Sequence, residues 1–228
     1  MAATGSRLAL TQRQIPATLD VVDADQITAR GLHSVKMAVD TLPGVSTGGS
    51  PGDPVELSMR GFTGGQVMVL FDGIHIGPSV VVNRPGNSFN LEKVEVLKGP
   101  ASVLYGQGAV GGVVNTVSKL PRFEHGRVDV LATYGSRGRV NLGVGAGTAL
   151  NDTIAVRADV ARTSSDGYVK NLPENALDVA ASMRWRPDAR LDVILKLDYL
   201  DDDPSPYFGT PLPGSRSEER RVGKECRS

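Results

Sequence analysis

The chain has 228 residues, of which 25 are basic and 25 acidic, so its formal net charge is zero. This balance gives no support to nucleic-acid binding, and the length allows one large domain or two modest ones. Frequent glycine and proline, with only 5% aromatic residues, favour strands and turns. Strands would have to make any membrane crossing, because no apolar run approaches the roughly 20 residues of a spanning helix. Since no signal peptide is visible after Met1, either the protein is cytosolic or its true N-terminus is missing.

The first half of the chain, up to Pro121, mixes short helical and short strand patterns. Ser34 is expected to cap a helix through Thr41. Asp72-Gly73 indicates a tight turn, and Pro100 can open a short helical turn closed by Gly106. Strand patterns cover 55–60, 66–71, 91–97 and 113–117. Together these signals predict a small α+β globule.

The second half alternates apolar and polar residues over long segments. These segments are 128–134, 142–146, 154–160, 177–185 and 191–199. Segments of about ten residues with one apolar face are typical of transmembrane barrel strands, although a soluble all-β domain has the same period. The connectors at 151–152 and 187–188 are tight and fit periplasmic turns, whereas 164–175 fits an extracellular loop. Five strands cannot close such a barrel.

Five sequence stretches carry a resemblance to a known family. They are IPATLDVVDADQI (15–27), AVDTLPGVST (38–47), LSMRGF (57–62), VLFDGIHI (69–76) and, above all, LEKVEVLKGPASVLYGQGAVGGVVNTVSKLP (91–121). They resemble the plug domain of TonB-dependent outer-membrane receptors. The resemblance implies an α+β plug domain at 1–121, followed at 122–215 by the first antiparallel strands of a truncated transmembrane β-barrel. In this family the plug is lodged inside a barrel of about 22 strands.

The resemblance also implies a function and partners. A scarce chelate binds at the extracellular side, and TonB of the inner-membrane complex then rearranges the plug. Arg60-Gly61-Phe62 is similar to the form common in the plugs of siderophore receptors. The segment 201–214 resembles the third extracellular loop of ferrichrome-type receptors. We therefore expect a ferric siderophore, TonB and outer-membrane lipid as partners, with iron present only within the siderophore. Another ligand (cobalamin, haem or a carbohydrate) and a stand-alone periplasmic binding module stay open as alternatives.

The resemblance suggests two sets of site residues. The ligand-contacting positions of the family map onto Arg60, Phe62, Gly77, Pro78 and Phe89. The structural motif of the plug maps onto Arg60, Gly61, Asp72, Gly73, Glu95, Gly99, Pro100, Tyr105, Gly106, Gly111, Gly112 and Asn115. Arg60 suits a buried latch to carboxylates of the barrel wall, or else a surface ion pair.

Enzymatic readings find less support in the residues. The run Gly106 to Gly111 satisfies G-x-G-x-x-G, but a β-branched stretch follows it where a dinucleotide-binding fold needs a long helix. His33, His75 and His125 are scattered without metal-ligand spacing, and no catalytic elbow or cysteine–histidine set is present. We expect no enzyme activity and no metal site.

The two ends of the sequence are unusual. Residues 216–228, RSEERRVGKECRS, hold the single cysteine and look like the translation of a sequencing adapter, so we exclude them from the fold as an artefact. At the other end, Ala2 to Arg7 resemble residues that follow a TonB box in this family. The box itself and any signalling extension would precede Met1.

Overall fold

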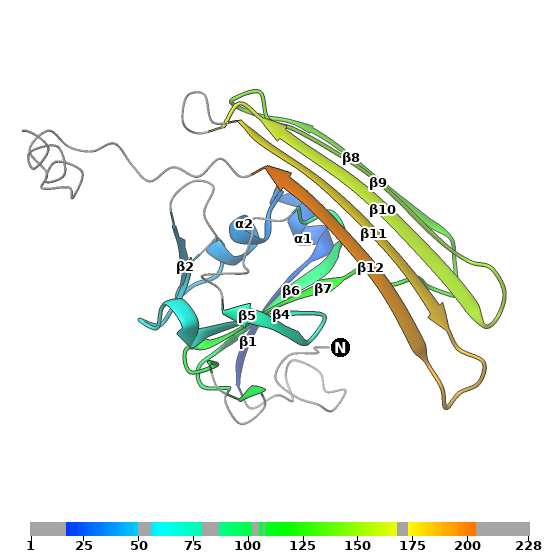
Figure 1. Cartoon of the computed structure of the whole chain (residues 1–228), viewed down its shortest axis with the longest axis horizontal. Helices are drawn as coiled ribbons and strands as arrows, with labels where there is room; N and C mark the ends of the chain where they lie inside the picture. The colour runs from blue at the N-terminus through cyan, green and yellow to red at the C-terminus, as the bar shows by residue number, and fades with distance from the viewer. Residues whose placement is uncertain are drawn as a thin grey trace, which may run out of the picture.

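The computed structural model describes residues 17–49, 56–78, 87–101, 105–106, 108–167 and 173–203. Its described strands form two five-stranded sheets and one two-stranded sheet. Figure 1 shows a mixed N-terminal domain beside a long, tilted and curved C-terminal sheet. We call the C-terminal sheet the wall. Expectations that concern 2–7, 102–104 and 204–228 lie outside the described residues.

The N-terminal sheet has the order β1-β6-β7-β4-β5. Its strands are β1 (Thr18–Asp23), β6 (Leu91–Lys98), β7 (Gly112–Ser118), β4 (Val67–Phe71) and β5 (Ile74–Pro78). β4 runs parallel to β7, whereas the other neighbours are antiparallel. The strands predicted at 66–71, 91–97 and 113–117 are confirmed as β4, β6 and β7, with β4 preceded by the short 3-10 turn η2 (Gly64–Gln66).

Two short helices and a small hairpin complete the N-terminal domain. The side chain of Asp23 accepts from the Gln26 amide and caps α1 (Ala24–Ala29). The hydroxyl of Ser34 accepts from the Met37 amide at 3.3 Å, as predicted, and caps α2 (Val35–Asp40). β2 (Val45–Gly48) pairs with β3 (Glu56–Met59). The expected helical turn is visible in part, because the Tyr105 amide donates to Ala101 O at 3.0 Å.

The core of the N-terminal domain forms as two apolar clusters. The larger cluster joins the helices to alternate residues of β6, including the fully buried Val39, Val94 and Val96. The smaller one centres on Leu70, Leu97 and Val113. Alternation along β6 sends successive side chains to opposite faces, so one strand contributes to both clusters. Apolar clusters therefore cover both faces of the N-terminal sheet.

The wall has the order β12-β11-β10-β9-β8, with all neighbours antiparallel. Its strands are β8 (Arg127–Tyr134), β9 (Val140–Ala149), β10 (Ile154–Ser165), β11 (Glu174–Trp185) and β12 (Val193–Asp203). All five predicted strands are confirmed, but β12 begins at Val193 and excludes Leu191, which was predicted to belong to it. An Asp188 side chain that accepts from the Leu191 amide at 3.0 Å holds this residue in the preceding turn.

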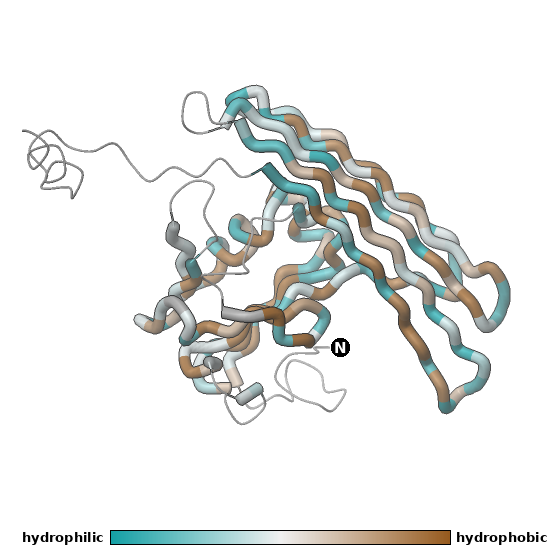
Figure 2. Tube along the Cα trace, in the orientation of Figure 1, coloured by the Kyte–Doolittle hydropathy of each residue, from teal (hydrophilic) through white to brown (hydrophobic). Residues whose placement is uncertain are grey.

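The two faces of the wall have opposite polarity. Val130, Val144 and Leu197 point away from the N-terminal domain and are 72%, 58% and 69% exposed. Arg157 and Asp159 point inward and are almost completely buried. Figure 2 shows brown and teal alternating along these strands. The wall thus presents apolar side chains outward and polar side chains towards the domain it covers, as the alternation predicted.

No helix among the described residues is both long enough and apolar enough to cross a membrane.

Candidate functional site at the domain–wall contact

The predicted ligand residues Arg60 and Phe62 follow β3 on the surface of the N-terminal domain. Arg60 has a left-handed backbone (φ 52°) and is exposed, and its Nη2 lies 3.5 Å from Thr18 Oγ1. The latch expected at Arg60 stays a prediction, because the structure describes five wall strands and the predicted barrel needs more. Phe62 is 37% exposed and pairs with Met59 across an isolated bridge. Both side chains are placed where a ligand could reach them.

The other three predicted ligand residues lie in two different places. Gly77 and Pro78 end β5, where they pair with Val69 and Met68 of β4. Phe89 is only 8% exposed. Its ring lies against Gly143 of β9, so that a Cβ added at Gly143 would come within 2.8 Å of it. This position gives Phe89 a packing role at the wall and leaves little of it for a ligand.

The predicted turn at Asp72-Gly73 is confirmed and shows why its neighbours belong to the structural motif. Both residues have positive φ angles, 52° and 82°, which a two-residue hairpin turn requires. The Gly73 amide donates to the fully buried Asn115 Oδ1 at 2.9 Å. The Ser118 amide donates to Asp72 Oδ1 at 3.0 Å. Asn115 and Asp72 therefore tie the turn to the neighbouring strand β7.

The glycine-rich block of the motif permits close packing. Gly112 has φ 152°, and a Cβ there would collide with the Met59 sulfur and the Leu97 carbonyl oxygen. A Cβ at Gly111 would lie 2.5 Å from Phe62 Cβ. The remaining glycines of the motif also have positive φ: Gly61 (87°), Gly99 (108°) and Gly106 (80°).

The other motif residues lie around this block. Glu95 is fully buried on β6 and pairs with Lys93 at 2.6 Å. Pro100 is exposed and Tyr105 packs against the smaller core cluster. The amide of Ala101, just after Pro100, donates to Ala109 O at 2.8 Å and closes the connection between β6 and β7. These residues pack within the N-terminal domain and close its connections.

One contact between domain and wall is formed by Asp72, Ser118 and Lys196. Lys196 lies on β12 and points inward, and its Nζ is 2.5 Å from Asp72 Oδ2. The same Nζ donates to Ser118 Oγ at 2.6 Å, and that hydroxyl donates to Asp72 Oδ2 at 2.7 Å. The side chains of Lys196 and Asp72 are 21% and 16% exposed, so this ion pair is largely shielded from water.

A second contact surrounds Phe89. Lys119 Nζ lies 4.6 Å from the centroid of the Phe89 ring, within range of a cation–π interaction. The Asn87 side chain donates to Thr163 Oγ1 of β10 at 3.0 Å, and it also accepts from the Phe89 amide at 2.8 Å. The segment before β6 is therefore fixed to the wall by both polar and apolar contacts.

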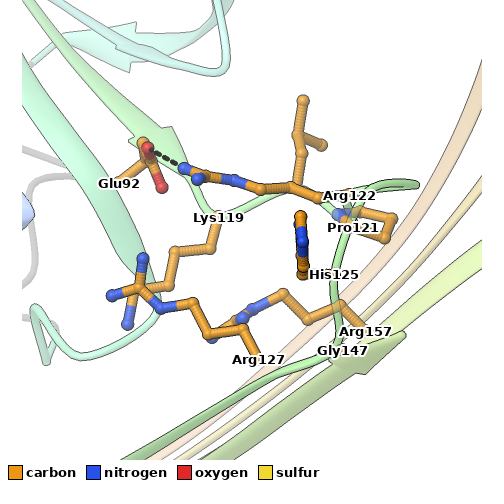
Figure 3. Close-up of a pocket in the computed structure, with 9 residues that line it drawn as sticks. Glu92, Lys119, Pro121, Arg122, His125, Arg127, Gly147 and Arg157 are labelled. Atoms are coloured by element: carbon orange, nitrogen blue, oxygen red, sulfur yellow. Dashed lines mark hydrogen bonds and ion pairs between the residues drawn. The ribbon is translucent and has the colours of Figure 1, made fainter. Parts of the chain in front are cut away.

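A third contact holds the segment between β7 and β8. Figure 3 shows Lys119, Arg122, Arg127 and Arg157 around a narrow pocket, with the Arg122–Glu92 ion pair of 2.9 Å drawn as a dashed line. Asp129 accepts from Arg157 at 2.6 Å and pairs with Lys119 at 3.4 Å. Burial lowers the pKa of Lys119, and the nearby Asp129 carboxylate opposes that shift.

The same connecting segment also binds the far end of the wall. Phe123 lies beneath the guanidinium groups of Arg186 and Arg184, at 4.8 and 5.9 Å from its ring centroid. Asp192 holds Arg184 in place through a hydrogen bond of 2.8 Å. The boundary predicted at residue 121 lies inside this clamped segment.

A cavity of about 740 Å³ separates α1 from strands β8 and β9. His33, Phe89, Arg139 and Asn141 are among its lining residues. Burial lowers the pKa of His33, and the Arg139 charge lowers it further. Within the described residues no group of three or more His, Cys, Asp or Glu side chains is arranged to hold a metal ion.

The sequence prediction missed the wall residues that make these contacts. Asp129, Arg157 and Lys196 had been recognised only as members of the polar faces of their strands. A charged side chain on the inner face of an alternating strand needs a partner when it is buried. The charged residues on the inner faces could therefore have been predicted to make ion pairs. Which residue of the N-terminal domain would face it depends on long-range packing.

Residues 11–113 match the family TonB-dependent Receptor Plug Domain. The chain is 33% identical over 211 residues to a ferrioxamine receptor of Yersinia enterocolitica, covering 88% of this chain and 29% of the relative. It is 28% identical to the ferrichrome outer membrane transporter/phage receptor of Escherichia coli, with coverage of 91% and 28%. The chain thus spans less than a third of the length of these relatives.

The fold has a solved counterpart. The pyoverdine outer membrane receptor of Pseudomonas aeruginosa superposes with a TM-score of 0.80 at 23% sequence identity. The match covers 89% of this chain and 30% of that receptor. At this level of identity the likeness shows the fold alone, an α+β domain followed by antiparallel wall strands.

Proposed function

Because residues 11–113 belong to the plug-domain family of TonB-dependent receptors, we propose that this chain is the plug and first wall strands of an outer-membrane receptor for ferric siderophores. The observation that carries this proposal is that the wall has an apolar outer face and a polar inner face. Its outward face bears exposed residues such as Val130 and Leu197, while its inward face is polar and packs on the domain. A membrane-spanning strand needs such an outer face.

The proposed mechanism involves binding and movement without covalent chemistry. A ferric siderophore binds on the outer side, and TonB then pulls on the plug from the periplasm. Iron enters only as part of the siderophore, and the receptor holds no cofactor of its own. The exposed positions of Arg60 and Phe62 are compatible with ligand contact, and this role stays a prediction for both residues and for Gly77 and Pro78.

The siderophore class is favoured by the relatives. Those named above are a ferrioxamine receptor and a ferrichrome transporter. The stand-alone periplasmic module is disfavoured, because a water-soluble domain would leave the apolar outer face of the wall, with Val130, Val144 and Leu197, in contact with water. The receptor would reside in the outer membrane of a double-membraned bacterium.

Transport by a hybrid receptor tests the proposal. Residues 1–203 of this chain would replace the equivalent part of the Yersinia ferrioxamine receptor, in a strain that lacks its own siderophore receptors. We expect the assembled hybrid to take up radioactive ferrioxamine B or ferrichrome in cells with TonB and to fail in cells without it. If the hybrid takes up labelled cobalamin and neither ferric chelate, the chain belongs to a receptor for another class of ligand. An assembled hybrid that transports none of the three compounds would refute the proposal.

A further inference from the structure

Asp72 has two structural roles, one in the β4–β5 turn and one in the contact with the wall. Within the N-terminal domain it forms the β4–β5 turn with a left-handed backbone, φ 52°. Such a backbone costs a residue other than glycine about 1 kcal/mol or more, although Asp and Asn tolerate it best. The surrounding structure must therefore hold the turn in place.

Strand β7 supplies the bonds that hold this turn. The Asp72 amide donates to Thr116 O at 2.8 Å, and both the amide and the hydroxyl of Ser118 donate to the Asp72 carboxylate. Ser118 is 6% exposed, so these bonds are shielded from water. Loss of the carboxylate geometry would leave buried donors without partners.

The same carboxylate is the attachment point for the wall. Lys196 of β12 contacts both Asp72 and Ser118, and the three groups close a triangle of hydrogen bonds. The Asp72 carboxylate thus accepts from strand β7 and from the wall at once. Hydrogen bonds that share a charged group strengthen one another and are lost together.

We propose that Asp72, Ser118 and Lys196 form a clasp that couples the docking of the plug on the wall to the order of the β4–β5 hairpin. When Lys196 withdraws, the carboxylate loses the cation that fixes it, and the strained turn loosens. When the turn opens, Lys196 loses its partner. Lys196 is thereby a positioning residue for the β4–β5 hairpin, which it contacts only at the turn.

The clasp has a consequence for the ligand side, which rests on the function proposed above. β5 begins beside the clasp at Ile74 and ends at Gly77 and Pro78, two predicted ligand positions. Opening of the clasp would free the strand that carries them. The coupling itself can be tested in the ligand-free receptor, so its failure is distinguishable from a failure of the siderophore proposal.

Hydrogen exchange of the assembled receptor in detergent micelles tests the clasp. In Lys196→Met, we expect the amides of Asp72, Gly73 and Ser118 to exchange about tenfold faster, because a shielded charged hydrogen bond is lost. Lys196→Arg keeps a cation and should restore most of the protection. Thr163→Val removes the Asn87 contact with the wall and does not touch the turn, so it should leave these amides unchanged.

A double-mutant cycle gives the second readout. Asp72→Asn keeps a residue that tolerates the left-handed turn and removes the charge. If the clasp is one unit, the Asp72→Asn/Lys196→Met pair exchanges no faster than the more affected single variant. Additive effects of the two substitutions, or unchanged exchange at Gly73 and Ser118 in Lys196→Met, would overturn the proposal.

Discussion

At the scale of single residues, the glycine-rich block of the plug is explained by contacts. Gly112 begins β7 at the point where β3 and β6 come closest to it, and its φ of 152° is outside the range that side chains favour. Neither atom that its Cβ would meet can move freely, since Met59 is fully buried and the Leu97 oxygen belongs to the backbone. Residue 112 must therefore be glycine for two independent reasons, the close contacts and the backbone angle.

Gly112→Ala should therefore destabilise the plug by about 2–4 kcal/mol, as overpacking and backbone strain combine. The measurement is the urea midpoint of unfolding followed by a probe in the plug. Gly48→Ala is the matched control, because Gly48 has no atom within 4 Å of its added Cβ and no positive φ. Equal midpoints for the two variants would contradict this explanation of Gly112.

Phe89 was predicted as a ligand position, and the structure adds a contact with the wall that the sequence did not reveal. Its place in the loop before β6 was correctly linked to the plug, but the loop folds back onto the wall. Gly143 on the inner face of β9 leaves the space that the ring fills. Only the tertiary structure brings residues 89 and 143 together, so local pattern could not reveal this contact.

At the scale of elements, the sequence predicted strands far better than it predicted their partners. Apolar and polar residues alternate along β8 to β12 because successive side chains of a strand point to opposite faces, so any strand with one apolar face shows this pattern. Caps such as Ser34 and the Asp72-Gly73 turn are equally local. The parallel pairing of β4 with β7 and the inward partners of Lys196 and Arg157 join distant parts of the chain, and no local pattern encodes them.

The outward row Val130, Val144, Val160, Val179 and Tyr199 lies across all five wall strands in one register. Val144→Arg should destabilise the assembled receptor by about 2–4 kcal/mol, because its charge would lie near the middle of the bilayer. Thr148→Arg is the control, since Thr148 also points outward but lies next to the turn, where the cost falls to about 0–1 kcal/mol. Unfolding from lipid vesicles measures both, and equal costs would argue against a membrane-spanning wall.

At the scale of the whole molecule, three sets of contacts, largely polar, attach the plug to the wall in the part of the chain that the structure describes. Lys196 holds the β4–β5 turn, Asn87 and Phe89 hold the loop before β6, and Phe123 holds the connection to β8. Polar contacts of this kind can exchange with water, whereas a purely apolar interface would resist separation more strongly. Such an interface is compatible with the plug movement that we propose.

The cavity beside α1 places one histidine at this interface, and we expect the interface to respond to pH through it. His33 of the plug lines the cavity, with Arg139 of the wall beside it and Glu174 acting in the opposite direction. Burial and then Arg139 lower the pKa of His33 below its ordinary value of 6.5. The folded protein thus favours the neutral imidazole, and protonation places a cation next to another cation.

The sign of the pH effect follows from linkage. Between the lowered folded-state pKa and 6.5, the unfolded chain binds more protons at His33 than the folded chain, so stability decreases as the pH falls through this window. Above 6.5 both states are neutral at this site and the effect is absent. His33→Gln removes the titration, so the native chain should lose more stability than this variant between about pH 7.5 and about pH 5. Thermal unfolding of both proteins across that pH range is the measurement. If stability changes with pH in the same way in both proteins, His33 does not contribute to the pH dependence.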